Sequence, residues 1–183
     1  MPKLVAKKQD WIDLGYRLFS EKGIAGIVIE KMAAQLGCNK SSFYWHFKTK
    51  KDFVAEMIRH WIRTETEQII EAVESAAQPK DKWTIFLQIA FKNDPYLEFI
   101  FFLKRYAQKN REVQRIIDQV DARRLAFTAQ LLAKNGYSKK EAVVKARIFY
   151  NYLIGYHEML RNKKQSKEYL SEVKEDLQHF LVL

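Results

Sequence analysis

The sequence has few residues that interrupt helices. Only six glycines and three prolines occur among 183 residues, and such low numbers favour an all-helical fold. One cysteine, Cys38, excludes an intramolecular disulfide and suits a reducing compartment. The most apolar stretch, residues 96–103, is too short to cross a bilayer and contains Glu98. A disulfide scaffold and a membrane-spanning protein are therefore not expected.

The charge is strongly biased toward cations. The chain carries 32 basic and 22 acidic residues, a net charge of +10, which favours a polyanionic partner such as nucleic acid. Residues 1–10 are basic but no apolar run follows them, so we expect no secretory leader and a cytoplasmic location. With 48% hydrophobic residues the chain can also bury a substantial core.

Apolar residues recur with helical spacing along nearly the whole chain. We expect no strand and about nine helices, over residues 4–22, 29–36, 40–46, 50–75, 83–92, 96–109, 112–134, 138–161 and 166–181. Thr49 is expected to cap the fourth helix, and Ser138 with Glu141 forms a capping-box pattern. We place a domain boundary inside the fourth helix, which divides the chain into residues 1–55 and residues 56–183.

The segment 32–53, MAAQLGCNKSSFYWHFKTKKDF, is the most informative part of the sequence. Gly37 can adopt the positive φ that a sharp turn between helices requires, and Asn39 is a good N-cap for the next helix. Phe43 and Phe47 are four residues apart and therefore share one face. The opposite face carries hydroxyls, a cation, an indole and an imidazole, which suits a nucleic-acid duplex.

These residues resemble the N-terminal signature of the tetracycline-repressor (TetR) family of bacterial transcription regulators. The resemblance lies in LFSEKG at residues 18–23, Met32-Ala33, Gly37 and SFYWHFKTKKDF at residues 42–53. It implies an all-α protein, with an N-terminal three-helix helix-turn-helix domain and a C-terminal helical ligand-binding domain. It also implies a homodimer on a palindromic operator in double-stranded DNA, released by a small apolar or aromatic ligand, with no cofactor.

Carried over by position, the helix-turn-helix spans residues 28–47. The residues expected to face base edges are Lys40, Ser41, Ser42 and Trp45. Those expected to contact phosphates are Tyr44, His46, Lys48 and Lys50. Two features depart from the family pattern: Ile27 and Val28 stand where a capping Thr or Ser is usual, and Glu30 begins the second helix, where it favours the helix dipole.

The C-terminal part offers two further candidate sites. The aromatic density of residues 83–106 and polar groups of the penultimate helix suggest an apolar ligand pocket lined by Trp61, Phe86, Phe99, Phe102, Tyr106, Asn151 and Tyr152. Apolar stripes on the last two helices suggest a dimer interface formed by Gly155, Tyr156, Met159, Leu170, Val173 and Leu177. Packing of both sets inside one subunit is the alternative.

The sequence shows none of the common catalytic patterns. Its four histidines form no spaced metal set, and no phosphate-binding glycine loop or nucleophile elbow occurs. We therefore expect neither an enzyme nor a metal site. The alternative function is a basic helical protein that binds DNA or a membrane surface non-specifically, without a ligand switch.

Overall fold

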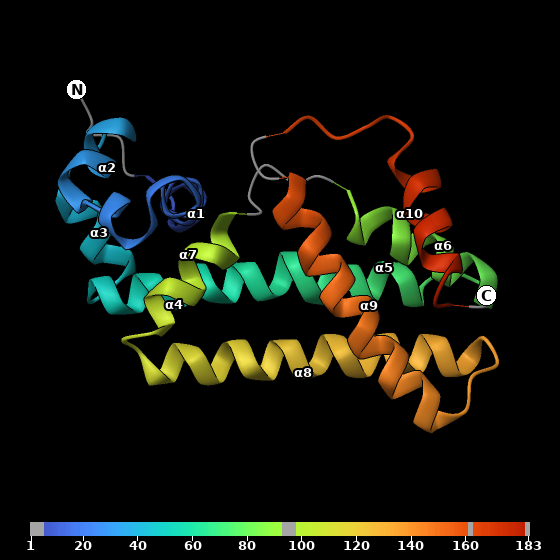
Figure 1. The fold of residues 1–183 in the computed structure, drawn as a ribbon. Helices are drawn as coiled ribbons and strands as arrows, with labels where there is room; N and C mark the ends of the chain where they lie inside the picture. The colour runs from blue at the N-terminus through green and yellow to red at the C-terminus, as the bar shows by residue number, and fades with distance from the viewer. Residues whose placement is uncertain (1–5, 93–97, 161–162, 182–183) are drawn as a thin grey trace. The chain divides into compact units, whose positions relative to one another are not determined.

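The computed structural model describes residues 6–92, 98–160 and 163–181, and within these ranges every regular element is a helix (Figure 1). Three ends of expected helices lie outside these ranges: residues 4 and 5 of the first helix, residues 96 and 97 of the helix 96–109, and residue 161 of the penultimate helix. The α-helices, with a short 3₁₀ turn after the first, are α1 (Lys8–Lys22), α2 (Ile29–Gln35), α3 (Lys40–His46), α4 (Lys50–Ile62), α5 (Gln68–Glu74), α6 (Pro79–Ala90), α7 (Glu98–Ala107), α8 (Arg111–Lys134), α9 (Lys139–Leu160) and α10 (Tyr169–Gln178).

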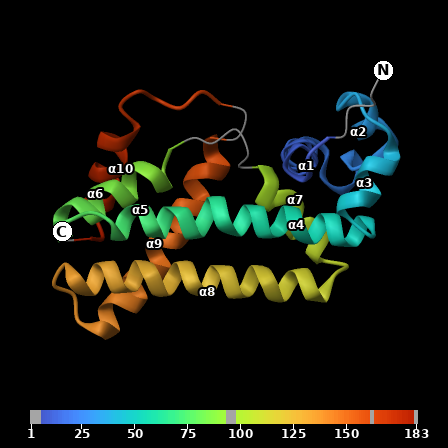
Figure 2. The ribbon, with the colours of Figure 1, turned by 180° about the vertical axis from the view of Figure 1, so that it is seen from behind.

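The stretch from α4 to α5 is continuous in helical conformation. A π-helical turn, Arg63–Glu67, joins the two α-helical segments. Counted as one helix, residues 50–74 agree with the predicted range, and the described residues then contain nine helices. The all-α fold class is confirmed. Figure 2 shows the same helices from behind.

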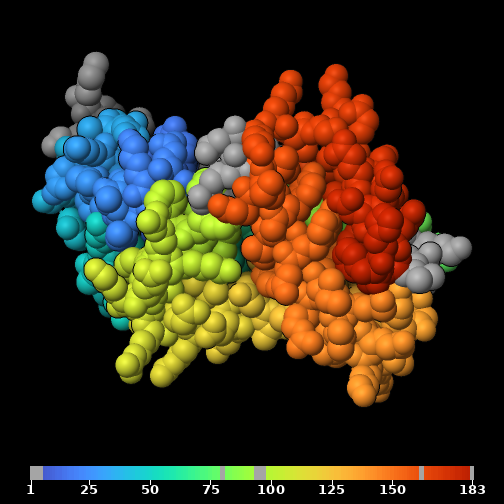
Figure 3. Space-filling model, in the orientation of Figure 1, coloured from blue at the N-terminus to red at the C-terminus, as the bar shows by residue number. Residues whose placement is uncertain are grey.

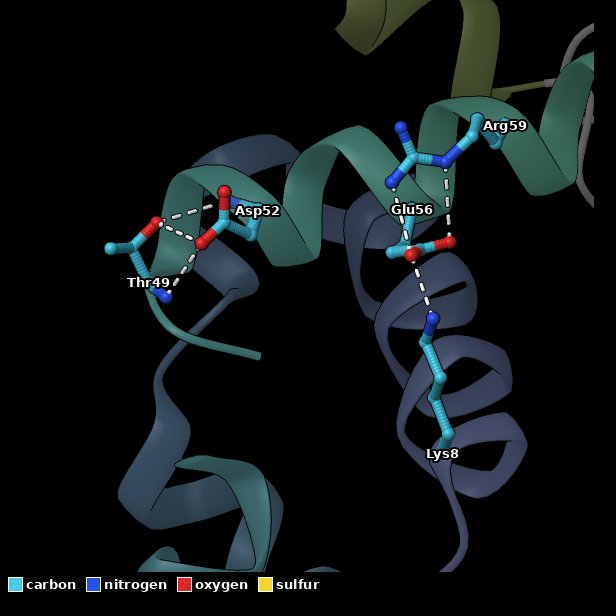
Figure 4. Close-up of polar contacts among 5 residues, drawn as sticks. All are labelled: Lys8, Thr49, Asp52, Glu56 and Arg59. Atoms are coloured by element: carbon cyan, nitrogen blue, oxygen red, sulfur yellow. Dashed lines mark hydrogen bonds and ion pairs between the residues drawn. The ribbon is translucent and has the colours of Figure 1, made fainter. Parts of the chain in front are cut away.

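The turns that set up α3 and α4 follow the sequence closely. Gly37 has φ +64°, as expected for the turn between α2 and α3. Asn39 occupies the N-cap position of α3 in extended conformation but makes no side-chain capping bond. Thr49 caps α4 fully: its Oγ1 accepts from the Asp52 N–H at 3.1 Å, and the Asp52 carboxylate accepts from the Thr49 N–H at 3.0 Å (Figure 4).

By packing, the described chain divides into two units. Unit 1 comprises residues 1–63 and 95–117. Its core is aromatic: Phe43 lies 5.3 Å from Trp11, 5.0 Å from Phe47 and 5.3 Å from Phe53, measured between ring centroids. All four rings are almost fully buried. The anchor phenylalanines of α3 therefore fix this helix on α1 and α4.

α7 also packs in unit 1, although it lies far from α1 in sequence. Phe99 stacks on Tyr16 with ring centroids 4.3 Å apart and lies 4.8 Å from Phe19. Trp61 stacks on Phe99 at 6.2 Å. In the same unit, Glu56 of α4 accepts from Lys8 at 2.7 Å and pairs with Arg59 at 3.0 Å (Figure 4).

Unit 2 comprises residues 64–94 and 118–183. Its buried core includes Val73, Trp83, Phe86, Leu87, Phe91, Phe127, Leu132, Ala146, Phe149, Val173 and Leu177. Polar bonds join its helices, since Tyr150 of α9 donates to Asp121 of α8 at 2.7 Å and Lys145 donates to the Phe180 carbonyl at 2.6 Å. The predicted functional boundary at residues 55/56 is not tested by this division and stays a prediction.

Candidate nucleic-acid interface

α3 has two chemically distinct faces. Ser42 and Phe43, with Phe47 directly after the helix, are buried. The residues exposed to solvent are Lys40, Ser41, Tyr44, Trp45 and Lys48. Trp45 is 84% exposed and Tyr44 52%, which is unusual for large aromatic side chains on a short helix. The helix therefore presents a polar and aromatic surface outward, as the sequence predicts.

Ser42 is the one predicted base-reading residue that the structure contradicts. It is only 5% exposed, and its Oγ donates to the Ala6 carbonyl at 3.4 Å. Ser42 lies beside Phe43 in the helical rotation, so it turns inward with the anchor residues. In this structure the Ser42 hydroxyl binds the segment before α1 and is not exposed to a base.

His46 shares the Ala6 carbonyl with Ser42. Its Nε2 lies 2.9 Å from that oxygen, and the ring is half-buried. Two side chains of α3, one turn apart, thus bind the same backbone acceptor. This gives His46 a structural partner inside the unit, while the expected phosphate contact of His46 stays a prediction.

Two of the lysines predicted to contact DNA, Lys40 and Lys50, each bind a partner within the protein. Lys40, the first residue of α3, pairs with Glu30 of α2 at 3.0 Å, and both side chains are more than half exposed. The hydrogen bond and charge of Glu30 raise the pKa of Lys40, and Lys40 lowers the pKa of Glu30. Lys50 donates to the Ile27 carbonyl at 2.6 Å, which ties α4 to the segment before α2.

The pairing of Lys40 with Glu30 is a feature that the sequence reading missed. The two residues are ten positions apart and belong to different helices, so helix periodicity does not connect them. The sequence pattern explained Glu30 through its helix dipole alone. The contact depends on how the turn at Gly37 orients α2 relative to α3, so it is found only from the structure.

The exposed set of α3 can serve both parts of DNA recognition. An ammonium group can donate to guanine O6 and N7, and a serine hydroxyl can bond several base edges. A tyrosine hydroxyl and a lysine are common phosphate ligands. The exposed indole of Trp45 can cover a thymine methyl group or a sugar by apolar contact.

The predicted pocket residues do not all lie in the same unit. Trp61, Phe99, Phe102 and Tyr106 belong to unit 1, and Phe86, Asn151 and Tyr152 to unit 2. Within their units, Trp61, Phe86 and Phe99 are buried core residues, whereas Asn151 is exposed on α9. The ligand pocket stays a prediction.

The predicted dimer residues fall into three groups. Val173 and Leu177 are at most 2% exposed in the core of unit 2, so their assignment to a dimer surface is wrong. Tyr156 and Leu170 are half-buried against that core. Gly155 and Met159 are exposed, and Met159 keeps 69% of its surface in solvent.

The exposed side of α9 forms a stripe that extends beyond Gly155 and Met159, the two exposed residues of the predicted dimer interface. We call it the α9 stripe; it consists of Val144, Ile148, Asn151, Gly155 and Met159, all exposed. Their spacing of four, three, four and four residues puts them on one helix face. Figure 3 shows α9, in orange, uncovered beside α10, in red. A Cβ atom added at Gly155 would meet nothing within 4 Å.

With its helix-turn-helix geometry, unit 1 contains the elements of a DNA-binding module. The family model described as "Bacterial regulatory proteins, tetR family" matches residues 12–57. This range covers most of α1, all of α2 and α3, and the first half of α4. The N-terminal helix-turn-helix of this chain is therefore that of the TetR family of transcription regulators.

Curated relatives agree with this assignment. The uncharacterised regulator YerO of Bacillus subtilis is 26% identical over 119 residues, which cover 62% of this chain and 41% of YerO. The repressor KstR2 of Mycolicibacterium smegmatis is 24% identical over 128 residues, covering 68% of this chain and 54% of KstR2. The chain thus spans about half the length of these relatives. Both relatives are described as transcription regulators.

Solved structures show the same fold over nearly the whole chain. A regulator from Saccharomonospora viridis, in complex with choline, has a TM-score of 0.80 at 14% identity and covers 96% of this chain and 97% of its own. AibR, in complex with isovaleryl coenzyme A and operator DNA, has a TM-score of 0.69 at 15% identity, with 91% and 95% covered. Among the residues described here, no helix has the length and apolar character needed to span a membrane.

Proposed function

We propose that the protein is a homodimeric repressor that leaves a palindromic operator when a small apolar or aromatic molecule binds its C-terminal part. One observation carries the proposal. In the described residues, the exposed large hydrophobic side chains occur on only two helices: Tyr44 and Trp45 on α3, and Val143, Val144, Ile148 and Met159 on α9. Exposed apolar groups gathered in this way mark interaction surfaces.

The α3 surface suits DNA because its aromatic residues stand among cations and hydroxyls. Lys40, Ser41 and Trp45 are assigned to base edges, and Tyr44 and Lys48 to phosphates. His46 and Lys50 are also assigned to phosphates, beside their backbone partners, because imidazole has a second nitrogen and an ammonium has three donors. The surplus of cations supports the non-specific part of the affinity.

The α9 stripe suits a second copy of the chain. Glycine inside a helix costs roughly 1 kcal/mol of stability relative to alanine. A Cβ atom at position 155 would meet no atom within 4 Å, so packing within unit 2 does not require glycine there. Close approach of a helix from another subunit is a reason to keep glycine there. Two subunits related by a two-fold axis would read half-sites about 34–36 Å apart, one turn of DNA.

The ligand part of the proposal rests on composition and on the relatives. Aromatic side chains are dense in α6, α7 and α9, and two proteins of the same fold were crystallised with a small ligand. A ligand shifts the population only if it binds the DNA-free form better than the DNA-bound form. Because the choline and coenzyme A complexes share the fold alone with this chain, the chemistry of its own ligand is assigned from its aromatic residues.

Selection of bound sequences from random DNA tests whether α3 recognises a base sequence. We expect a palindrome with two half-sites, and we expect Trp45→Ala and Lys48→Ala to weaken its binding at unchanged folding. Lys22→Ala, which removes an exposed cation of α1, is the matched control. The net charge of +10 would also favour a basic protein that binds DNA without sequence recognition. For such a protein we expect no enriched sequence and equal effects of Lys48→Ala and Lys22→Ala.

Sedimentation tests whether the α9 stripe binds a second copy of the chain. The wild type is expected to be a dimer at micromolar concentration, and Ile148→Glu with Met159→Glu is expected to give folded monomers. Ser171→Glu, which adds one charge at an exposed site of α10, should leave the dimer intact. A monomeric wild type, or a dimer insensitive to both α9 changes, would contradict this assignment.

A further inference from the structure

We infer that Glu30 is a specificity-determining residue, which holds Lys40 for base reading and weakens the attraction of the α3 surface to DNA of any sequence. The inference rests on the proposed reading role of α3. It starts from one contact, the pair of Lys40 Nζ and Glu30 Oε1 at 3.0 Å. Among the ion pairs of unit 1 that the structure shows, this one joins the two helices of the helix-turn-helix itself.

The position of Lys40 makes a partner necessary. Lys40 is the first residue of α3, where the unsatisfied N–H groups and the helix dipole disfavour a cation. Glu30 occupies the first turn of α2, where the same dipole favours an anion. The two helices thus place a favoured carboxylate beside a disfavoured ammonium, and the pair offsets the unfavourable charge at the start of α3.

The exposure of the pair makes it available to DNA. The side chain of Lys40 is 54% exposed and that of Glu30 is 64% exposed. Lys40 belongs to the exposed set of α3 that also includes Ser41, Tyr44 and Trp45, and Glu30 contacts it from α2. An ammonium has three donors, and a bond to Glu30 occupies one of them. Two donors remain, which is the number that guanine O6 and N7 accept.

Pairing has two consequences for recognition. A lysine has a flexible four-carbon stem, and a fixed partner restricts where its charge lies. Glu30 therefore restrains Lys40 to fewer positions before a base is met. Its negative charge also opposes the phosphate backbone, so it lowers the affinity for DNA in general more than for a site that bonds Lys40 directly. Repulsion of the wrong partner is a common source of specificity.

The test compares Glu30→Gln with the wild type on the selected operator, on operator variants with single base changes, and on unrelated DNA. We expect tighter binding to unrelated DNA and a log K against log salt slope steeper by up to about one unit. At the base that Lys40 contacts, we expect the preference to fall by roughly fivefold or more. Glu21→Gln, which removes an exposed carboxylate of α1, is the matched control for charge alone.

A double-mutant cycle separates positioning from general charge. In a Lys40→Ala background, Glu30→Gln should no longer change the base preference, because the residue that it positions is gone. A change in preference of equal size in both backgrounds would overturn the inference. So would an effect of Glu30→Gln on all DNA that equals that of Glu21→Gln.

Failure of the inference about Glu30 can be distinguished from failure of the proposed function. If the wild type selects no sequence, the reading role of α3 fails before Glu30 is examined. If the wild type selects a sequence and Lys40→Ala alters it, but Glu30→Gln leaves preference and salt slope unchanged, the function stands and the inference about Glu30 is wrong.

Discussion

Arg124 of α8 binds Thr66 in the π-helical turn of residues 63–67. Its Nε donates to Thr66 Oγ1 at 2.9 Å, and its Nη2 donates to the Glu65 carbonyl at 2.8 Å. Thr66 is only 2% exposed. A π turn changes the hydrogen-bond register of a helix, and side chains that bond its backbone stabilise it. Arg124 thus holds the turn at which α4 continues into α5.

Arg124→Met is expected to lower the free energy of unfolding by about 1–3 kcal/mol, because buried polar groups of the turn lose a donor. Arg123→Met is the matched control. Its partner Glu67, at 3.0 Å, belongs to a pair that is 50% and 33% exposed, and such pairs contribute about 0–1 kcal/mol. Urea unfolding of both variants checks the difference, and equal losses would show that the turn does not depend on Arg124.

Gly15 marks the closest approach of α1 to α4. A Cβ atom there would lie 2.3 Å from Phe53 Cζ and 2.7 Å from Met57 Sδ, and both side chains are fully buried. Gly15→Ala should therefore destabilise the protein by about 1–3 kcal/mol, although alanine favours helices by about 1 kcal/mol.

The thermal unfolding of Gly15→Ala, Phe53→Leu and the double variant checks this packing. Because leucine is smaller than phenylalanine, the double variant should lose less than the sum of the two single losses. Additive losses, or a Gly15→Ala variant more stable than the wild type, would contradict the close approach.

Glu56 gives unit 1 a pH-dependent contact. Its hydrogen bonds with Arg59 and then Lys8 lower its pKa below the usual value of 4.5. A carboxylate with a lowered folded pKa stabilises the fold above its unfolded pKa, and this stabilisation is lost as the pH falls through the folded pKa. Its contribution is therefore present near neutrality and absent in acid.

Glu56→Gln should lower the free energy of unfolding at about pH 7 by less than about 1 kcal/mol, since the group is partly solvated and screened. The difference from the wild type should shrink as the pH falls through the lowered folded pKa of Glu56, and vanish once the carboxyl is protonated in both the folded and the unfolded state. Urea titrations at about pH 7 and at successively lower pH values check this. A difference that persists in acid would assign the effect to packing and not to charge.

The sequence predicted the elements whose signals are local. The bounds of α3, the turn at Gly37 and the N-cap at Thr49 were confirmed because each depends on residues within a few positions. Ser42 was misassigned because its partner, the Ala6 carbonyl, is 36 residues away. The buried face of α3 includes both Ser42 and its neighbour Phe43. Helix periodicity alone does not show how far around the helix the buried face extends.

The C-terminal helices show the same limit. The stripe of Val173 and Leu177 has the spacing of a helix face that is buried somewhere, but spacing does not say whether the cover is the same chain or another. The structure shows that unit 2 itself covers both residues. The α9 stripe has the opposite character, because it contains Asn151 and Gly155 among apolar residues and remains uncovered within the unit.

Selection from random DNA with the wild type and with Lys40→Ala is the most direct measurement of base reading by α3. We expect the wild type to enrich a palindrome, and Lys40→Ala to enrich a sequence altered at the same position in both half-sites. Identical enriched sequences from the two proteins, or none from the wild type, would contradict base reading by this helix.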